Sequence, residues 1–270
     1  MVAAKPWDSL EREGLPDPIQ TTPGMLTWHE RKMLYWLARD WYEGVGQIVD
    51  AGAYLGLSAV CFRAGLHDRG MEGRRVHSYD MFQLGPFEQT VFEGERPPHD
   101  ATLPLFEKHT SPYRGLGYAH AGNILNNRWA DQWQSTQTPG GEVPEVPGIE
   151  ILFVDVAKTS LIWDHLIEHF FPHLIARRSL LILQDYMFSK SGAWHHITME
   201  KLREYFPYVT DTGVNSVLFE CRNVPSAAVL AAAKWSAIPD GQKPRLLDSA
   251  IGRFSAEQQE ILQDVRAQLQ

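Results

Sequence analysis

The strongest constraint on the fold of this chain is the regular alternation of short apolar runs with amphipathic segments of helical periodicity. Strands that lie inside a parallel sheet are buried on both faces, so they are apolar along most of their length. Alternation of such strands with helices predicts a parallel sheet that helices cover on both faces. The strands predicted in this way are Gln47–Ala51, Arg75–Tyr79, Gly117–Ala121, Glu150–Val154 and Ser179–Leu183.

Helix signals stand at the places that this arrangement requires. Thr27, with Glu30 three residues later, has the pattern of a capping box and predicts the start of a first helix that ends near Gly44. The helices predicted between strands are Leu55–Leu66, Thr159–Phe171 and Ala193–Phe206. Tyr208–Asp211 and Ser216–Cys221 are two further apolar runs without an intervening helix, and they predict an antiparallel hairpin at the end of the sheet.

We therefore predict a three-layer α/β sandwich with a seven-stranded, mostly parallel sheet and with helical N- and C-terminal extensions. A chain of 270 residues that is 44% hydrophobic can form one sizeable core. The predicted parts are an N-terminal arm and helix (1–44), the α/β domain (45–222) and a C-terminal helical extension (223–270) packed on the same domain. This extension is predicted to hold one Ala-rich helix and one polar helix, Ser255–Leu269.

Two segments rich in proline and glycine, 84–113 and 134–148, are too long to be simple connections. By their length they are predicted to be lids or insertions on the substrate side. Residues 1–25 also contain several prolines and show little periodicity, which predicts a tail or an extended arm.

Composition and charge exclude several classes of function. A formal net charge of −8 opposes binding to a nucleic acid, because that affinity depends on clustered Lys and Arg. The sequence shows no signal-peptide pattern and no apolar stretch long enough to cross a bilayer, so we expect a cytoplasmic protein without a membrane partner. The apolar-rich first helix could also serve as the interface of a homodimer.

A glycine-containing turn follows the first predicted strand directly and opens the next helix. Gly52 and Gly56 permit tight turning and close approach of the backbone, and a helix N-terminus offers unpaired N–H groups to a polar ligand. The second strand ends in Asp80, whose carboxylate can accept hydrogen bonds from both hydroxyls of a ribose. A dinucleotide site is less favoured, because the three-glycine fingerprint is absent.

This segment resembles motif I of class I S-adenosylmethionine-dependent methyltransferases, and within them it is most similar to the macrocin O-methyltransferase-like branch. Two sequences carry the resemblance, Gly52-Ala53-Tyr54-Leu55-Gly56 and Tyr79-Asp80-Met81-Phe82. It implies that the turn lines the methionine side of S-adenosylmethionine, that Asp80 holds the ribose and that Met81 or Phe82 flanks the adenine. The residues of the turn expected to bind the cofactor are Asp50, Gly52, Tyr54, Gly56 and Ser58.

After the third strand, Asn123 stands near the position where many members of the superfamily carry an acid close to the adenine amino group. It could make that contact, and it could equally cap a helix or a turn.

Two acids follow strands four and five, and they predict a second part of the site. Because ligands bind at the carboxyl ends of strands in open α/β sheets, Asp155 and Asp185 can share one crevice with the cofactor, and Asp155 can contact it. Their oxygens would suit Mg²⁺, which could orient the acceptor and lower the pKa of its hydroxyl. The resemblance supports this prediction, and Lys158 has the spacing of the general-base lysine in the catechol branch.

The sequence also departs from the family pattern. Ala157 stands where the macrocin-like branch carries a second acid, and Gln184 replaces the first acid of a pair after strand five. These changes leave open whether the metal site is complete. They also leave open whether Asp155 only caps a helix and Lys158 is only a solvated amine. His196, near the start of the following helix, is an alternative base.

The function predicted from these features is S-adenosylmethionine-dependent methylation of a hydroxyl on a small molecule, a sugar or a secondary metabolite. Removal of the hydroxyl proton and alignment with the methyl group are the chemical requirements of that reaction. One alternative keeps the cofactor but methylates nitrogen or transfers another of its groups. A second is a non-catalytic binding or scaffold protein with this fold, and NAD-dependent hydride transfer is the least favoured.

Overall fold

The computed structural model describes residues 5–71, 73–86, 88–92, 97–131, 146–213 and 215–269. Its seven strands follow the order β3-β2-β1-β4-β5-β7-β6 in one mostly parallel sheet, which confirms the predicted fold class. The chain divides into two compact units, which we call the N-terminal unit (5–126) and the C-terminal unit (127–270). The predicted division into an arm, an α/β domain and a C-terminal extension stays a prediction. No described helix has the length and apolar character needed to span a membrane.

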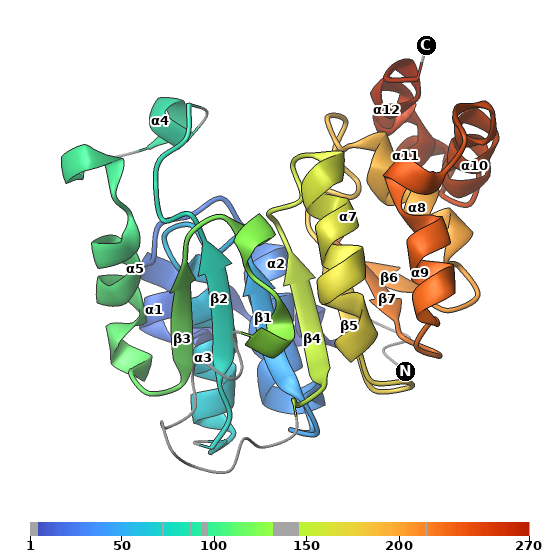
Figure 1. Ribbon diagram of the computed structural model, residues 1–270. Coiled ribbons are helices and arrows are strands. Elements are labelled where there is room, and N and C mark those ends of the chain that lie inside the picture. Colours follow the sequence, from blue (N-terminus) through green and yellow to red (C-terminus); the bar gives the residue numbers. More distant parts are fainter. Residues whose placement is uncertain are drawn as a thin grey trace. The chain divides into compact units, whose positions relative to one another are not determined.

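The N-terminal unit contains three parallel strands, with Ile48 opposite Val76 and Val76 opposite Gly117. Helices α2 and α3 pack together, and α5 packs on α3 beside the strands (Figure 1). Its elements are η1 (Pro6–Ser9), η2 (Arg12–Gly14), α1 (Asp17–Thr21), α2 (Trp28–Trp36), the π-helical turn η3 (Leu37–Trp41), β1 (Gln47–Ala51), α3 (Leu57–Asp68), β2 (Val76–Asp80), α4 (Glu88–Val91), η4 (Pro98–Asp100), α5 (Leu103–Thr110), η5 (Ser111–Tyr113), β3 (Gly117–Ala121) and η6 (Ile124–Asn126).

The C-terminal unit pairs β4 with β5 in parallel, and β5 continues into the antiparallel pair β7 and β6. The predicted closing hairpin is thereby confirmed. Its elements are β4 (Ile149–Val154), α7 (Ser160–His169), η7 (Phe171–His173), β5 (Leu180–Leu183), α8 (Ala193–Lys201), β6 (Tyr208–Asp211), β7 (Val217–Glu220), α9 (Ala227–Ala233), η8 (Trp235–Ala237), η9 (Asp240–Gln242), α10 (Lys243–Ile251), α11 (Ala256–Ile261) and α12 (Gln263–Ala267).

Local chemistry explains why these elements begin where they do. The Thr27 side chain accepts from the Glu30 N–H and the Glu30 carboxylate accepts from the Thr27 N–H, so the predicted capping box forms. The Thr159 hydroxyl likewise accepts from the N–H of Ile162 at the start of α7. All residues of β1 and β4 are buried, as expected for strands covered on both faces.

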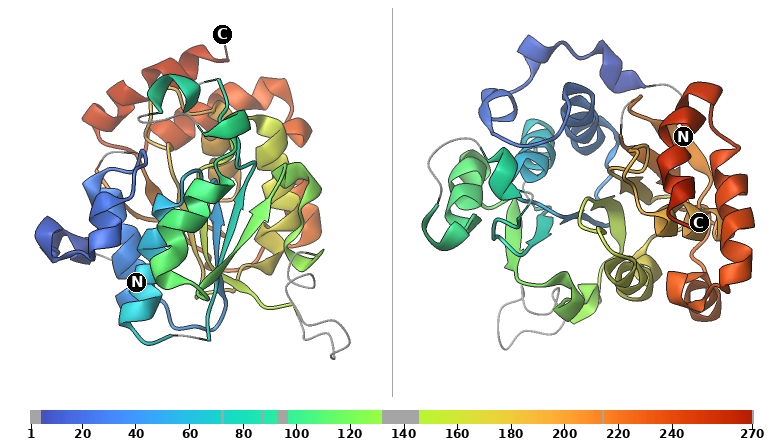
Figure 2. Two further views of the ribbon diagram at one scale, coloured as in Figure 1. Left: turned by 90° about the vertical axis from the view of Figure 1, so that its left-hand side faces the viewer. Right: turned by 90° about the horizontal axis from the view of Figure 1, so that it is seen from above.

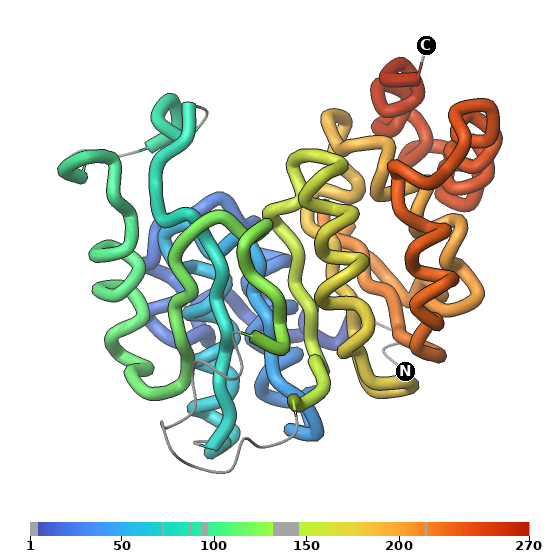
Figure 3. The backbone as a smooth tube through the Cα atoms, in the orientation of Figure 1, coloured from blue at the N-terminus to red at the C-terminus, as the bar shows by residue number. Residues whose placement is uncertain are grey.

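The C-terminal segment differs from the prediction. The polar helix expected at Ser255–Leu269 is two short helices, α11 and α12, because the backbone leaves helical geometry at Leu262. The C-terminal end of the chain, red in Figure 3, is accordingly a series of short helical turns. Leu262 is also fully buried, so the break turns an apolar side chain inward. Helix α10, which carries a proline in its first turn, was not predicted.

The N-terminal segment differs as well. Trp7 and Ile19 are fully buried and Leu15 nearly so, which makes this segment a packed part of the N-terminal unit rather than a tail. The buried side chains of α2, including Met33 and Leu34, lie in a helix that packs against α3. The apolar character of this helix therefore no longer indicates a dimer interface, and a homodimer stays a prediction.

Candidate functional site

The turn between β1 and α3 has the geometry that the sequence predicted. Gly52 and Gly56 have φ of 105° and 96°, values that glycine adopts without strain. Tyr54 also has a positive φ, 47°, which is uncommon for a residue with a side chain and is typical of functional turns. A Cβ at position 56 would lie 3.0 Å from the Phe106 ring, so any larger residue would be crowded there as well as strained in conformation.

Helix α5, which lies within the segment 84–113, contacts this turn. His109 Nδ1 donates to the carbonyl of Leu55 over 2.7 Å, and Thr110 and Phe106 stand against Gly56. Phe106 also packs with Phe82, with ring centroids 4.9 Å apart. Leu103–Thr110, part of the segment 84–113 that was expected to be a lid or an insertion on the substrate side, therefore packs against the turn, and the role of the segment stays a prediction. Residues 134–145 of the second expected lid lie outside the described residues.

Asp80 ties the end of β2 to the glycine turn. Its Oδ2 accepts from the Tyr54 N–H over 2.9 Å and its Oδ1 accepts from the Phe82 N–H over 2.6 Å. Burial raises the pKa of Asp80, while these two N–H groups lower it. Each carboxylate oxygen has a further lone pair. Asp80 can therefore hold the turn and still accept hydrogen bonds from a ligand.

Asp50 and Ser58, which were predicted to touch the cofactor, lie inside the protein instead. Asp50 is 0% exposed and Ser58 4% exposed. The Ser78 hydroxyl donates to Asp50 Oδ2 over 3.0 Å, and Ser58 favours the ionised form of the same carboxyl. This burial opposes direct contact of either side chain with a ligand, because almost none of their surface is exposed. The hydrogen bond from Ser78 instead joins Asp50 on β1 to β2.

Asp50 should make stability depend on pH. Burial raises the pKa of Asp50 from 3.8 to about 6, so the protonated carboxyl favours the folded state. That contribution is complete below about pH 4 and is lost as the pH rises through about 6, with a cost on the order of 3 kcal/mol. We expect Asp50→Asn to remove this loss. Denaturant unfolding between about pH 4 and about pH 7.5 measures it, and a stability difference between variant and native chain that does not change with pH would contradict it.

The residues predicted to flank adenine have different environments. Phe82 is 4% exposed and belongs to a buried cluster with Ala53, Ala59 and Phe106, whereas Met81 is 56% exposed. Only Met81 therefore has surface available to a ligand. The Asn123 side chain accepts from the Leu125 N–H over 3.0 Å, which is the turn-capping alternative, and its contact with adenine stays a prediction.

In the C-terminal unit, Lys158 joins the two acids predicted at the ends of β4 and β5. Its Nζ lies 2.7 Å from Asp155 Oδ1 and 2.7 Å from Asp185 Oδ2. Asp185 has a positive φ of 62°, a strained conformation that directs its carboxylate to this ion pair. The Lys158 side chain is 58% exposed, so solvent screens the interaction and it adds little to stability.

This ion pair opposes the predicted role of Lys158 as a base. Burial alone would lower the pKa of Lys158, but Asp155 and Asp185 outweigh it and raise the pKa above its ordinary value. An amine that accepts a proton from the acceptor must first be deprotonated, and the two carboxylates make that state rarer. The arrangement favours Lys158 as a fixed cation.

The predicted magnesium site is not supported. Mg²⁺ needs near-octahedral oxygen ligands, and no group of three or more His, Cys, Asp and Glu that could hold a metal occurs among the described residues. The ammonium of Lys158 also stands within hydrogen-bond distance of both candidate ligands, Asp155 and Asp185, and would repel a dication. The residues present do not fit this metal.

His196 does not have the exposure that a base for an external acceptor needs. It is 0% exposed, and its ring lies 4.1 Å from the Tyr186 ring. Burial lowers the pKa of His196 to about 3. The neighbouring His195 is 7% exposed and meets the Trp163 ring edge-on. Both histidines therefore pack in the interior of the C-terminal unit, and a role of His196 as a base stays a prediction that this burial does not favour.

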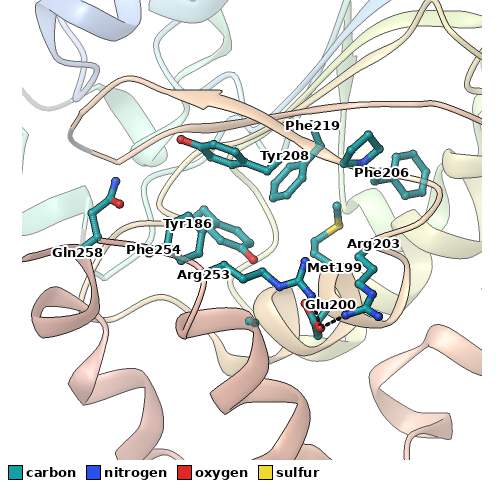
Figure 4. Close-up of a pocket in the computed structure, with 12 residues that line it drawn as sticks. Tyr186, Met199, Glu200, Arg203, Phe206, Tyr208, Phe219, Arg253, Phe254 and Gln258 are labelled. Atoms are coloured by element: carbon teal, nitrogen blue, oxygen red, sulfur yellow. Dashed lines mark hydrogen bonds and ion pairs between the residues drawn. The ribbon is translucent and has the colours of Figure 1, made fainter. Parts of the chain in front are cut away.

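A second feature of the C-terminal unit is a cavity of about 260 Å³ (Figure 4). Aromatic rings form much of its wall, and the ion pairs of Glu200 with Arg203 and Arg253 lie at one side. The cavity cannot be predicted from local sequence, because its wall combines residues from α8, β6, β7 and α10. The aromatic residues that line it are Tyr186, Phe206, Tyr208, Phe219 and Phe254.

Glu200 is expected to stabilise this cavity wall. Its Oε1 accepts from Arg203, Arg253 and the Ser249 hydroxyl at 3.2, 2.8 and 2.8 Å, and its side chain is 6% exposed. We expect Glu200→Gln to lower the free energy of unfolding by about 1–3 kcal/mol, because charge-assisted bonds are lost from a buried group. Denaturant midpoints measure it, with the exposed Glu204→Gln as the matched control; equal midpoints for the two variants would refute it.

The sequence analysis also missed Arg63, which is 4% exposed on α3. Arginine is mostly exposed in proteins, so its position in a helix does not by itself suggest burial. The signal that could have found it is the run Ala59-Val60-Cys61-Phe62-Arg63-Ala64, in which one charged residue interrupts an otherwise apolar helix.

Comparison with known proteins supports the fold. No family model matches the sequence, and no curated protein matches it. The apo structure of CalS11, described as a TDP-rhamnose 3′-O-methyltransferase of calicheamicin biosynthesis, is similar with a TM-score of 0.50 and 15% identity over 79% of this chain and 82% of that chain. A second structure of CalS11 gives 0.50 and 14% over the same shares. The O-methyltransferase NovP gives 0.49 and 14% over 72% and 78%. At these identities, the likeness to CalS11 shows that the chain has the fold of this kind of methyltransferase.

Proposed function

We propose that this chain, which has the fold of the methyltransferase CalS11, binds S-adenosylmethionine and transfers its methyl group to a hydroxyl of a small molecule. The observation that carries the proposal is the turn after β1. It combines positive φ at Gly52, Tyr54 and Gly56 with a hydrogen bond from the Tyr54 N–H to Asp80 at the end of β2. This local geometry matches what the resemblance to motif I requires.

The residues of the N-terminal unit fit the cofactor. When bound, S-adenosylmethionine supplies a methyl group on a positively charged sulfur that is open to in-line attack. Gly52 and Gly56 let the backbone approach the ligand closely, and Asp80 accepts hydrogen bonds from the ribose hydroxyls. Met81, which is 56% exposed, offers its side chain to the adenine. Asp50 and Ser58 act indirectly, by supporting the turn.

The residues of the C-terminal unit supply the groups that act on the acceptor. Asp185 Oδ2 accepts from the Lys158 ammonium, while Asp185 Oδ1 makes no hydrogen bond with the described residues. We propose that Asp185 accepts the proton of the acceptor hydroxyl. Lys158 holds the two carboxylates in place and stabilises the negative charge that develops on the acceptor oxygen. Asp155 completes the ion pair, and its contact with the cofactor stays a prediction. No step requires a metal.

The acceptor that we propose is a sugar or a secondary metabolite. The similarity in fold to CalS11, described as acting on TDP-rhamnose, supports a small hydroxylated acceptor. The net charge of −8 also opposes a nucleic-acid acceptor.

A second candidate is a non-catalytic protein that binds the cofactor. It is favoured by Ala157, which replaces an acid, and by Lys158, which occupies one oxygen of each remaining acid. Methylation of nitrogen, or transfer of another group of the cofactor, would leave the N-terminal unit's role unchanged.

Calorimetric titration with S-adenosylhomocysteine, with and without Mg²⁺, tests the cofactor. We expect saturable binding that is the same under both conditions, because the residues present do not fit the metal. Absence of binding would refute the proposal. Transfer of labelled methyl from S-adenosylmethionine to a panel of sugars, sugar nucleotides and hydroxylated aromatics then separates the enzyme from the non-catalytic protein, since only the enzyme yields a product one methyl group heavier.

A further inference from the structure

A polar cavity of about 340 Å³ lies in the N-terminal unit, at the outer strand β3. Its floor is Gly117 and Ala119, the first small residues of that strand, and its other walls come from α3, α5 and η5. Figure 2 (left) looks onto the edge of the unit where α5 lies over β3. None of the residues proposed above to touch the cofactor lines this cavity.

A buried arginine forms one wall of the cavity. Arg63 is 4% exposed, and its Nε and Nη2 have no hydrogen-bond partner among the described residues. Its guanidinium stands over the Phe106 ring, 5.4 Å from the centroid. Burial lowers the pKa of Arg63 to about 10, so the group keeps its charge at neutral pH, and Asp50 favours that charge from a distance. Buried N–H donors without acceptors are costly, and in native proteins they are almost always satisfied.

Gly117 leaves the room in which the guanidinium packs against the strand. A Cβ at position 117 would lie 2.6 Å from both Nε and Nη2 of Arg63, and 2.5 Å from the carbonyl oxygen of Val76. Any side chain there would displace the arginine or close the space beside it. The position of the Arg63 guanidinium therefore depends on the absence of a side chain at Gly117.

The rim of the cavity is also charged. Arg114 is exposed and lines the cavity together with Glu107. The hydroxyls of Thr110 and Ser111 donate to the carbonyls of Phe106 and Lys108, so they do not offer their protons to a ligand. The side chains with donors left for a ligand among the residues that line the cavity are thus Arg63 and Arg114, whose planar guanidinium groups suit the oxygens of phosphate.

We infer that this cavity binds a small phosphate-bearing molecule, with its phosphoryl group held between Arg63 and Arg114. The cavity is many times larger than the roughly 30 Å³ that one water occupies in the liquid, so it has room for the phosphoryl group and for part of its ester. The inference stands independently of the proposed function, since it uses neither the glycine turn nor Asp185.

Calorimetry at constant ionic strength, maintained with chloride, tests this site on the full-length protein. The probes are inorganic phosphate, glucose 1-phosphate and glucose. We expect saturable binding of both phosphates with a dissociation constant of about 1 mM or lower, and none of glucose. Tighter binding of the ester would identify a phosphorylated metabolite as the ligand, and equal binding would identify the phosphoryl group alone. No saturable phosphate binding would overturn the inference.

Variants at the rim locate the site without disturbing the core. Arg114→Gln should weaken phosphate binding about tenfold, and Glu107→Gln should tighten it, because each changes one charge at the cavity. Lys108→Gln is the matched control, since it removes a positive charge from α5, the helix of Glu107, at an exposed position that does not line the cavity. An equal loss in Lys108→Gln and Arg114→Gln would show general surface attraction and overturn the assignment. Arg63→Lys should also weaken binding, because it loses the fork while keeping the charge.

Discussion

Asp80→Ala is expected to weaken the binding of S-adenosylhomocysteine by about ten- to a hundredfold, which is the loss expected for hydrogen bonds between a charged acceptor and the ribose hydroxyls. The variant also removes the acceptor of the Tyr54 and Phe82 N–H groups, so the glycine turn loses its anchor to β2. Calorimetric titration measures the affinity, and denaturant unfolding of the same samples measures the stability.

Two further variants separate the ligand contact from the support of the turn. Asp80→Asn keeps one carbonyl oxygen and should retain more of the affinity than Asp80→Ala. Asp17→Asn removes an exposed carboxylate from the same unit without touching the turn, and it should bind as the native chain does. Native affinity in Asp80→Ala would contradict both the ribose assignment and the importance of the turn.

Lys158→Met is expected to reduce the rate of methyl transfer by about a hundred- to a thousandfold on the best acceptor from the panel, while cofactor affinity stays near native. Without the ammonium, Asp155 and Asp185 stand close together with no cation between them. The acceptor oxygen then also lacks a nearby positive charge in the transition state. Initial rates under saturating cofactor measure the effect.

Lys158→Arg distinguishes the two roles that the sequence and the structure assign to this residue. A guanidinium stays protonated at all accessible pH values, so it can replace a fixed cation but not a base. We expect Lys158→Arg to retain activity within about tenfold of native, because the ion pair can reform. Equal inactivity of the Arg and Met variants would restore Lys158 as the base. Activity of Lys158→Met near the native level would remove Lys158 from the mechanism altogether.

Binding of phosphate beside Arg63 and binding of S-adenosylhomocysteine at the glycine turn can be distinguished with the variant Arg114→Gln. Phe106 packs with Phe82 near the glycine turn and also stands under the Arg63 guanidinium. Arg114→Gln leaves both contacts in place, so it should alter phosphate binding and leave the affinity for S-adenosylhomocysteine unchanged.

The positions of several strands and of the glycine turn could be predicted from local sequence. The predicted runs Gln47–Ala51, Gly117–Ala121 and Tyr208–Asp211 coincide with β1, β3 and β6. Burial on both faces and the conformations open to glycine are properties of short segments, which explains this agreement. The helix ends were less accurate, as with α8, because a helix ends where its tertiary contacts end.

The chemical state of the site depended on residues remote in sequence. Asp80 accepts a hydrogen bond from the N–H of Tyr54, 26 residues away in the sequence, and Lys158 donates to Asp185, 27 residues away. Exposure was decided in the same way, since His196 is buried although its sequence position suggested access. Charge, pKa and accessibility arise from neighbours that only folding brings together. The sequence by itself therefore determined the α/β architecture and the glycine turn, and the tertiary structure decided that Lys158 is an ion-paired cation and that the side chains of Asp50 and Ser58 are buried.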